Sequence, residues 1–480
     1  MSNNENAFSP LAKKMAALSL PILAGQAFGL LYNLVDTWFI ARIDPADPWL
    51  VGATGLVFPL FFIILAASFG ITGGVSSLVA RSIGSARALG TDRNPQLDST
   101  AESGMFLALA ASAAFLILLY AFARPLLALF GGTGQILEYG FSYLVWLLPV
   151  IPFMFVNAVF TGILQGEGRT KHMMVSMILG TVANIVLDPV LIFAAGMGIG
   201  GAGLATAIGN LVSTVYLVSV FIAQRSSVRV HWQVSRISFP VAGEILRVGV
   251  PHSLMNFLAS ISFIFYNRMM VGMNPLILTA FTLYSRLEQI ALIPVWSLSS
   301  ALSSIAGQAA GANDIPRMRA ASRTAAWIGF AVTGTLYLGY VLASRPLFAA
   351  FQSDPRVLDL ASSIVPWMAL ASVVSIPIFM FMTVMSVAGF ANQSLILTSI
   401  RIYALSVPAC AIGVYVVGKN LNAAMVGLFV ASALSLLLTQ AWRYRFFRAL
   451  ETGRLVVRLS AGSNSVDATE TRDEGPSGSE

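Results

Sequence analysis

Long runs of apolar residues, several of them twenty or more residues in length, recur along the whole chain and restrict what it can fold into. A transmembrane helix needs about 20 consecutive, mostly apolar residues to cross the hydrocarbon core of a bilayer. The runs do not alternate between apolar and polar residues as the strands of a membrane β-barrel do. With 57% hydrophobic and only 10% charged residues, the chain cannot coat soluble domains with polar surface. The sequence therefore predicts an all-α polytopic protein embedded in the lipid bilayer.

Charged residues, glycine and proline divide the apolar runs into twelve predicted transmembrane helices. The first six are 15–40, 52–81, 104–123, 139–165, 172–195 and 203–224. The second six are 245–271, 277–309, 320–343, 359–388, 394–416 and 423–446. The predicted organisation is an N-terminal segment (1–14), an N-lobe (15–224), a linker (225–244), a C-lobe (245–447) and a tail (448–480). The tail is predicted to be largely disordered because it is rich in Ser, Gly, Asp and Glu.

The formal net charge of +7 comes from lysines and arginines that gather in short loops and in the tails. Loops after the second, fourth, sixth and eighth spans carry many of them, for example Arg87, Arg169, Arg225 and Arg317. Because basic loops stay on the cytoplasmic side, we expect the N-terminal segment, the linker and the tail to be cytoplasmic. These charges are topology signals, so no nucleic acid is expected as a partner.

Short motifs in the first half of the chain return in the second half. Ser-Ser-Leu-Val-Ala-Arg from Ser76 matches Ser-Ser-Ile-Ala-Gly-Gln from Ser303. Arg-Pro-Leu-Leu-Ala-Leu-Phe from Arg124 matches Arg-Pro-Leu-Phe-Ala-Ala-Phe from Arg345. A repeat of six spans, an even number, leaves both copies in the same orientation. The pattern predicts two parallel six-helix lobes around a central cleft, which is a transporter architecture.

Two acids lie inside the predicted spans of the N-lobe. Asp188 is the only formally charged residue in 173–224, and Asp36 is the only one in the first span. A carboxylate at bilayer depth costs about 2.5–3.5 kcal/mol, which makes it a candidate functional residue. The repeat places Tyr266 and Ile412 at the equivalent positions of the C-lobe, so the acids occur once. The alternative is a structural carboxylate that is hydrogen-bonded to neighbouring helices.

Polar neighbours make Asp188 a candidate ion site. Asn184 precedes it by four residues, which places both side chains on one face of a helix. Pro189 cannot donate to the carbonyl of Ile185, so the helix weakens there and a backbone oxygen is freed. Thr206 of the next span lies at a similar depth. The alternatives are that the asparagine only links helices and that the threonine hydroxyl only bonds the carbonyl four residues earlier.

These groups all fall in the outer half of the membrane. At about 1.5 Å per residue, Asp36, Thr206 and Asp188 lie roughly 9, 11 and 15 Å from the outer ends of their helices. Two carboxylates that are close together in a low dielectric repel each other when both are ionised, so the pair can take up a proton or bind a small cation. Carboxylate, amide, hydroxyl and carbonyl oxygens are also suitable ligands of a hard cation such as Na⁺.

Four motifs together carry a family resemblance: Leu-Pro-Ile-Leu-Ala-Gly-Gln from Leu20, Leu-Tyr-Asn-Leu-Val-Asp-Thr from Leu31, Leu-Gln-Gly-Glu-Gly-Arg-Thr-Lys from Leu164 and Asn-Ile-Val-Leu-Asp-Pro from Asn184. The chain resembles the multidrug and toxic compound extrusion (MATE) family, in its DinF-like branch, over all but its tails. In that branch the cation site occupies positions that match Asp36, Asn184, Asp188 and Thr206. The bend of the first helix falls on positions that match Pro21 and Gly25.

The chain departs from the NorM-like branch of the same family. That branch places acids in helices 7 and 10, whereas this sequence has no acid between Arg247 and Arg268 or between Asp359 and Arg401. The resemblance therefore implies that coupling takes place in the N-lobe.

The resemblance implies secondary active multidrug efflux by H⁺ or Na⁺ antiport, with alternating access. The expected substrates are amphipathic, often cationic drugs. The expected location is the inner (plasma) membrane of a prokaryote, and the expected state is a monomer. We expect no enzymatic activity, no cofactor and no metal other than a coupling Na⁺. The alternative is a lipid-linked oligosaccharide or lipid flippase of the same superfamily, which would need cationic side chains in the cleft.

Glu288 and Arg286 in the eighth span are second-tier candidates for a gate or for the lining of the cleft. They are two residues apart and do not face each other on a helix, so each needs another partner. The alternative is a structural ion pair for each. Arg401 is expected to extend its guanidinium to the cytoplasmic interface. The run from Gly198 to Gly203 fits a GxGxxG pattern, but it joins two membrane spans and not a strand to a helix, which argues against a dinucleotide site.

Overall fold

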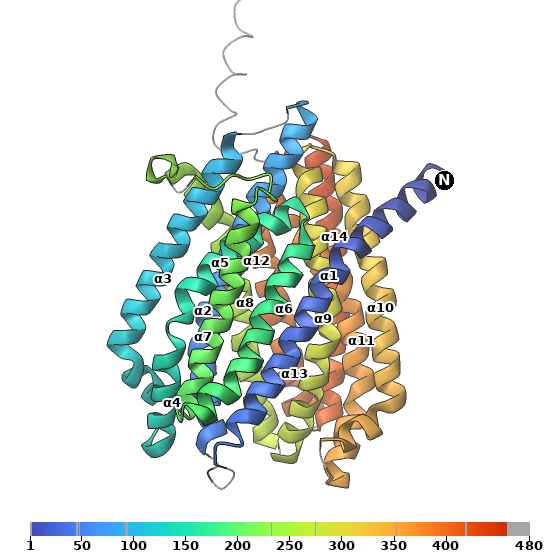
Figure 1. The fold of residues 1–480 in the computed structure, drawn as a ribbon. Helices are drawn as coiled ribbons and strands as arrows, with labels where there is room; N and C mark the ends of the chain where they lie inside the picture. The colour runs from blue at the N-terminus through green and yellow to red at the C-terminus, as the bar shows by residue number, and fades with distance from the viewer. Residues whose placement is uncertain are drawn as a thin grey trace, which may run out of the picture.

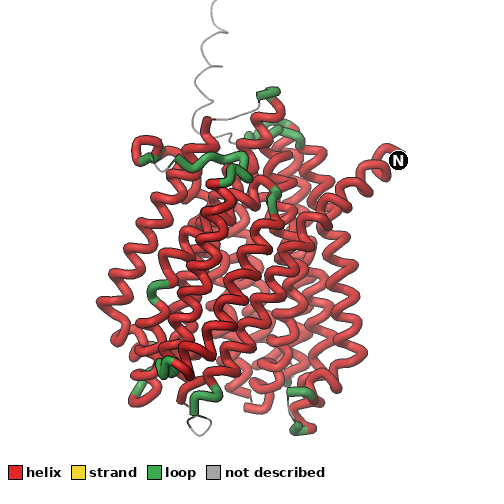
Figure 2. Tube along the Cα trace, viewed as in Figure 1, coloured by secondary structure: helices red, strands yellow, loops and turns green. Residues whose placement is uncertain are grey.

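Helices make up the fold, and the described part of the chain contains no β-strand (Figure 2). The computed structural model describes residues 2–44, 47, 49–91, 95–231, 233–273, 275–351, 353–417 and 420–457. Long helices stand side by side in one bundle (Figure 1). The predicted all-α fold is confirmed, whereas the part of the predicted disordered tail beyond residue 457 lies outside the described residues.

In the described residues of the first half, the chain forms seven α-helices. They are α1 (Ser2–Ile40), α2 (Trp49–Ala88), α3 (Pro95–Leu129), α4 (Gly134–Leu147), α5 (Val150–Glu167), α6 (Thr170–Pro189), which continues as the π-helix η1 (Val190–Ala194), and α7 (Ile199–Ile222). The connection to the second half contains the 3-10 turn η2 (Val234–Arg236).

The second half of the chain begins with four long helices. They are α8 (Phe239–Met273), α9 (Pro275–Gly311), α10 (Ile315–Ala349) and α11 (Pro355–Met385). A segment of alternating α- and π-helix follows, made of η3 (Ser386–Phe390), α12 (Ala391–Ser399), η4 (Ile400–Ser406), α13 (Val407–Ile412) and η5 (Gly413–Val417). The last element is α14 (Leu421–Glu451).

Within the described residues, eleven helical segments are long and apolar enough to cross a membrane. One of them, Pro355–Val417, has 63 residues, whereas a hydrocarbon core of about 30 Å needs only about 20. The helix breaks inside this segment at Gly389, whose φ of 93° suits glycine and not other residues. The segment is therefore two spans joined by a tight turn, and the prediction of twelve spans is confirmed.

Two spans of the first half are interrupted at proline. The fourth predicted span consists of α4 and α5 with Pro149 near the break. The fifth consists of α6, which ends at Pro189, and of the wider π-helix η1. Proline has no N–H to donate, and π-turns often occur at functional sites. Asp188 therefore lies directly before a change in helix type.

The buried apolar residues form separate cores in the two lobes. The core of the first lobe extends from Ile22 to Ile245. The two large cores of the second lobe contain residues from Met270 onward, together with Met15 of α1. In line with that exception, α1 packs against α6 of its own lobe and also against α9 of the other lobe. Figure 1 shows the N-terminal end of α1 leaving the bundle.

The lobes meet closely at one end of the bundle, which we call the arginine-rich end after Arg81, Arg87, Arg169 and Arg225. Here α2 packs against α8 and α9. Gly84 of α2 faces the carbonyl oxygen of Gln308, and Gly311 of α9 faces the carbonyl oxygen of Arg81. A Cβ atom on either glycine would overlap the opposite backbone, so only glycine permits this approach. The repeat relates these residues to each other: Arg81 to Gln308 and Gly84 to Gly311 are each separated by 227 residues, which is the spacing of the Ser-Ser motif repeat.

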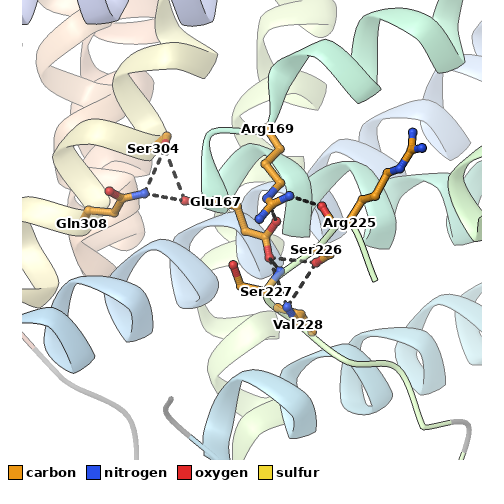
Figure 3. A network of polar contacts seen from close by, with 9 residues as sticks. Glu167, Arg169, Arg225, Ser226, Ser227, Val228, Ser304 and Gln308 are labelled. Atoms are coloured by element: carbon orange, nitrogen blue, oxygen red, sulfur yellow. Dashed lines mark hydrogen bonds and ion pairs between the residues drawn. The ribbon is translucent and has the colours of Figure 1, made fainter. Parts of the chain in front are cut away.

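Gln308 of α9 connects the second lobe to two helices of the first lobe, and Figure 3 shows its bond to the end of α5. Its Nε2 donates to the carbonyl oxygen of Gly166 at 3.1 Å, and its Oε1 accepts from Arg87 Nη1 at 2.9 Å. One turn earlier, Ser304 donates to the same Gly166 oxygen at 3.3 Å. These bonds hold the lobes together at the arginine-rich end.

The connection between the lobes is held at the same end by Glu167 (Figure 3). Its carboxylate accepts from the Ser226 hydroxyl at 2.8 Å and from the backbone N–H groups of Ser227 and Val228 at 2.7 and 3.2 Å. Arg169 forms an ion pair with the same carboxylate at 3.1 Å. The buried acid is thus satisfied, and it fixes the start of the connection against the end of α5.

Candidate functional site

Asp36 lies on the buried face of α1. Its side chain is 8% exposed, and its Oδ1 has no hydrogen-bond partner among the described residues. Tyr32 is four residues earlier in the same helix and therefore shares its face. The two residues interact electrostatically, which places the phenol beside the carboxylate.

Asn184 and Asp188 lie on the buried face of α6, as their spacing predicts. Their exposed fractions are 3% and 0%. Both carboxylate oxygens of Asp188 and the Oδ1 of Asn184 lack a hydrogen-bond partner within the described residues. Asp188 interacts electrostatically with Asp36, so the structure brings the two acids of the N-lobe together.

Thr206 of α7 connects the other polar groups. Its hydroxyl donates to the carbonyl oxygen of Ala202 at 3.1 Å, the helical bond that the alternative interpretation expected. The same oxygen lies 2.9 Å from the Tyr32 hydroxyl and 3.3 Å from Asn184 Nδ2. Because its only proton goes to the Ala202 carbonyl, Thr206 accepts from both the tyrosine and the asparagine. It therefore contacts α1 and α6 as well as stabilising its own helix.

Tyr143 of α4 completes the cluster and was not predicted. Its side chain is 9% exposed and interacts electrostatically with Asp36, Asp188 and Tyr32. Tyr32 carries a sequence signal, because it precedes Asp36 by one helical turn. Tyr143 carries none, because it comes from a helix whose spacing to the acids is set only by the fold.

The cluster offers several oxygen atoms without hydrogen-bond partners in a buried space. They are Asp36 Oδ1, both carboxylate oxygens of Asp188 and Asn184 Oδ1. Buried polar groups are normally hydrogen-bonded, so each unpaired oxygen needs an explanation. A proton shared between the acids or a hard cation held by these oxygens would satisfy them.

Pro21 and Gly25 lie in α1, which runs unbroken through both residues. A Cβ atom on Gly25 would lie 3.0 Å from Met177 Sδ and 3.4 Å from the Cα of Met174, both in α6. The glycine therefore marks a close approach of α1 to the helix that carries Asp188. The helix is thus continuous at the predicted hinge.

Glu288 and Arg286 do not pair with each other. Glu288 Oε1 accepts from the Ser372 hydroxyl at 3.2 Å, which connects α9 to α11, and Tyr284 and Tyr337 interact electrostatically with the same carboxylate. Arg286 is exposed. The glutamate thus belongs to a polar cluster in the second lobe, and it is separate from the acids of the first lobe.

Arg401 does not reach the interface as expected. Its Nε is buried without a hydrogen-bond partner among the described residues, and its guanidinium interacts with Tyr266 of α8. Tyr266 is 19 residues beyond Arg247, or about 28 Å along the helix from the arginine-rich end. The expectation is wrong because Arg401 turns toward α8 and not along its own helix.

Comparisons with known proteins agree with the fold. The family model MatE matches residues 21–190 and 251–412, one stretch in each lobe. The chain is 26% identical to the FAD transporter of Shewanella oneidensis over 420 residues, covering 85% of this chain and 90% of that protein. It is 24% identical to the probable multidrug resistance protein YoeA of Bacillus subtilis over 463 residues, covering 92% and 96%.

A solved structure of a multidrug resistance MATE family transporter in an outward-facing conformation superposes on the chain with a TM-score of 0.85. The identity is 25%, and the match covers 92% of this chain and 97% of that chain. The two-lobe fold and the family match define a multi-pass membrane transporter. The chain belongs to the MatE family, that of the multidrug and toxic compound extrusion transporters.

Proposed function

We propose that this protein exports amphipathic small molecules in exchange for H⁺ or Na⁺, and that the coupling site is formed by Asp36, Asn184, Asp188 and Thr206. The observation that carries the proposal is that Asp188 is buried beside Asp36. Neither carboxylate oxygen of Asp188 has a hydrogen-bond partner among the described residues. Tyr32 and Tyr143 line the same space. The arrangement fits the DinF-like branch, since all the acids of this cluster belong to the first lobe.

Binding of one positive ion neutralises a costly pair of charges. Each ionised carboxylate at this depth costs about 2.5–3.5 kcal/mol, and a bound proton or Na⁺ removes much of that penalty. Each proton that enters down 100 mV supplies about 2.3 kcal/mol, enough for a substrate gradient of about fiftyfold.

The transport cycle proceeds by alternating access. Tight glycine contacts and the bonds of Gln308 close the arginine-rich end, which the basic loops place in the cytoplasm. The protein in this form faces outward, with α1 helical through Pro21 and Gly25. Ion binding at Asp36 and Asp188 lets α1 bend at Pro21 and Gly25, which reshapes the cleft and releases the substrate outside.

We infer the substrate class from two proteins of similar sequence. One is named a probable multidrug resistance protein and the other an FAD transporter. Amphipathic drugs are the first candidate. A dinucleotide such as FAD is the second, and the guanidinium of Arg401, whose Nε is buried, favours it because an anionic substrate needs a cation within the membrane.

The test is efflux of ethidium, and separately of FAD, from proteoliposomes in which the pH gradient and the Na⁺ gradient are imposed one at a time. Wild type should export at least one compound under at least one gradient. Asp36→Asn and Asp188→Asn should reduce efflux to the level of empty vesicles. Asp354→Asn is the matched control because it removes an acid at the start of α11, outside the site, and it should retain efflux. Full efflux by Asp36→Asn would refute the coupling mechanism.

A further inference from the structure

The second lobe has a polar cluster around Tyr266, one of the positions that the repeat relates to the coupling site. Tyr266 of α8 takes the place that Asp36 has in the first lobe. It interacts electrostatically with Arg401 of η4, and Ser406, the last residue of η4, interacts with the same hydroxyl. Where the first lobe gathers carboxylates, the second gathers a guanidinium, a phenol and a hydroxyl, all of which can donate hydrogen bonds.

Arg401 lies deep in the membrane. It is ten residues after Ala391, the first residue of α12, which corresponds to about 15 Å of helix. A guanidinium at this depth costs about 2.5–3.5 kcal/mol on the mildest scale, and such residues normally pair with an acid or a carbonyl. No ion pair to Arg401 is found within the described ranges, and its buried Nε lacks a hydrogen-bond partner there.

The backbone around Arg401 also departs from regular helix. It belongs to η4, a seven-residue π-helix, and π-turns inside longer helices occur frequently at functional sites. Tyr403 in the same turn donates to the carbonyl oxygen of Leu258 at 2.7 Å and so fixes η4 against α8. The Tyr403 ring also packs against Phe265, the residue before Tyr266, with ring centroids 6.4 Å apart, so η4 is fixed against the part of α8 that carries Tyr266.

We propose that Arg401 and Tyr266 form an anion-binding site in the second lobe that takes the carboxylate or phosphate group of a transported compound. The inference rests on the proposed export function, and it adds that substrates with an acidic group are recognised. A planar guanidinium binds carboxylate and phosphate oxygens through two parallel N–H donors, and the tyrosine hydroxyl adds a third. Glu288 interacts with Tyr266 as well, so a compound that also carries a positive group has a partner nearby.

The test compares two dyes that differ in one group. Rhodamine 110 has a free carboxylate, and rhodamine 123 is its methyl ester. Binding to the purified full-length protein in detergent is measured by fluorescence anisotropy, without any ion gradient. Wild type should bind rhodamine 110 about tenfold more tightly than rhodamine 123, because one hydrogen bond between charged groups contributes about that much to the affinity. Arg401→Gln should remove that preference while leaving the affinity for rhodamine 123 unchanged, and Arg401→Lys should keep part of it.

Controls separate this site from the coupling site. Arg268→Gln removes an exposed arginine of α8, two residues from Tyr266, and should keep the full preference. Asp36→Asn should keep it too, so loss of coupling and loss of anion recognition are distinguishable. If Arg401→Gln does not fold, Tyr266→Phe should reduce the preference about threefold. Equal affinities of the wild type for both dyes, or a preference that persists in Arg401→Gln or in a folded Tyr266→Phe, would overturn the proposal.

Discussion

The Tyr32 hydroxyl of α1 donates a hydrogen bond of 2.9 Å to the Thr206 hydroxyl oxygen of α7. That oxygen also accepts from the amide of Asn184, so the amide nitrogen is engaged and the amide oxygen remains free. The tyrosine thus connects the position of α1 to the orientation of an oxygen in the coupling site. Any bend of α1 that moves Tyr32 would disturb this contact.

Replacing Tyr32 with phenylalanine should weaken binding of the coupling ion. The substitution removes one hydrogen bond of about 0.5–1.5 kcal/mol, which corresponds to an increase of about twofold to tenfold in the ion concentration for half-maximal efflux. Efflux from proteoliposomes at graded pH or Na⁺ measures this value. Tyr120→Phe, at an exposed tyrosine of α3, is the control and should leave it unchanged. An unaltered ion dependence in Tyr32→Phe would show that the bond plays no part in ion binding.

Asp188→Asn should make the protein more stable while it abolishes transport. The buried carboxylate has no partner among the described residues, and a neutral amide costs less at that depth, so unfolding should require about 1–3 kcal/mol more. Thermal unfolding in detergent measures the effect, which should shrink as the pH falls and the aspartate becomes protonated. Asp359→Asn removes an exposed acid paired with Arg345 and should change little. A destabilised Asp188→Asn protein would mean that the acid is structurally paired.

Gly84→Leu and Gly311→Leu should each open the arginine-rich end. A side chain at either position overlaps the opposite backbone, so the closed contact between α2 and α9 cannot form. Spin labels on cysteines at Arg225 and Arg317, in a Cys410→Ala background, should move apart in double electron–electron resonance. Gly55→Leu in the same helix meets no atom within 4 Å and should leave the distance unchanged. Equal distances in all three variants would contradict the proposed closure.

Gly389→Ala should lower the stability by about 1–2 kcal/mol, because an alanine is strained at a φ of 93°. The new Cβ would also lie 3.1 Å from Arg81 Nη1. The midpoint of thermal unfolding in detergent reports the change. Gly339→Ala in α10 has open space and helical geometry, so it should be neutral or slightly stabilising. A wild-type midpoint for Gly389→Ala would mean that the turn between the two spans tolerates other backbone angles.

Local spacing predicted that Asn184 and Asp188 share one face of a helix, because four residues make about one turn. The same rule relates Tyr32 to Asp36, although Tyr32 was not predicted as a site residue. The motif repeat predicted two equivalent lobes. Gly84 and Gly311 are also equivalent positions of this repeat. Only the structure shows that the helices that carry them pack against each other there.

The spacing of residues along the sequence could not predict which side chains meet between different helices. Tyr143 joins the acids only through the packing of α4, and Ser372 finds Glu288 across two helices. The direction of the Arg401 side chain was predicted wrongly because a long side chain in an isolated helix has no neighbour to attract it. The break at Gly389 depends on a single backbone angle, and hydropathy does not report such angles.

Gly84 and Gly311 occupy the same position of the repeat, so the closed end is one surface meeting its own copy. A self-complementary surface of this kind is what two identical six-helix chains would use to pair about a twofold axis. The seam inside this protein thus has the geometry of a homodimer interface within a single chain. At this seam a bulky replacement in one half cannot be relieved by the other half.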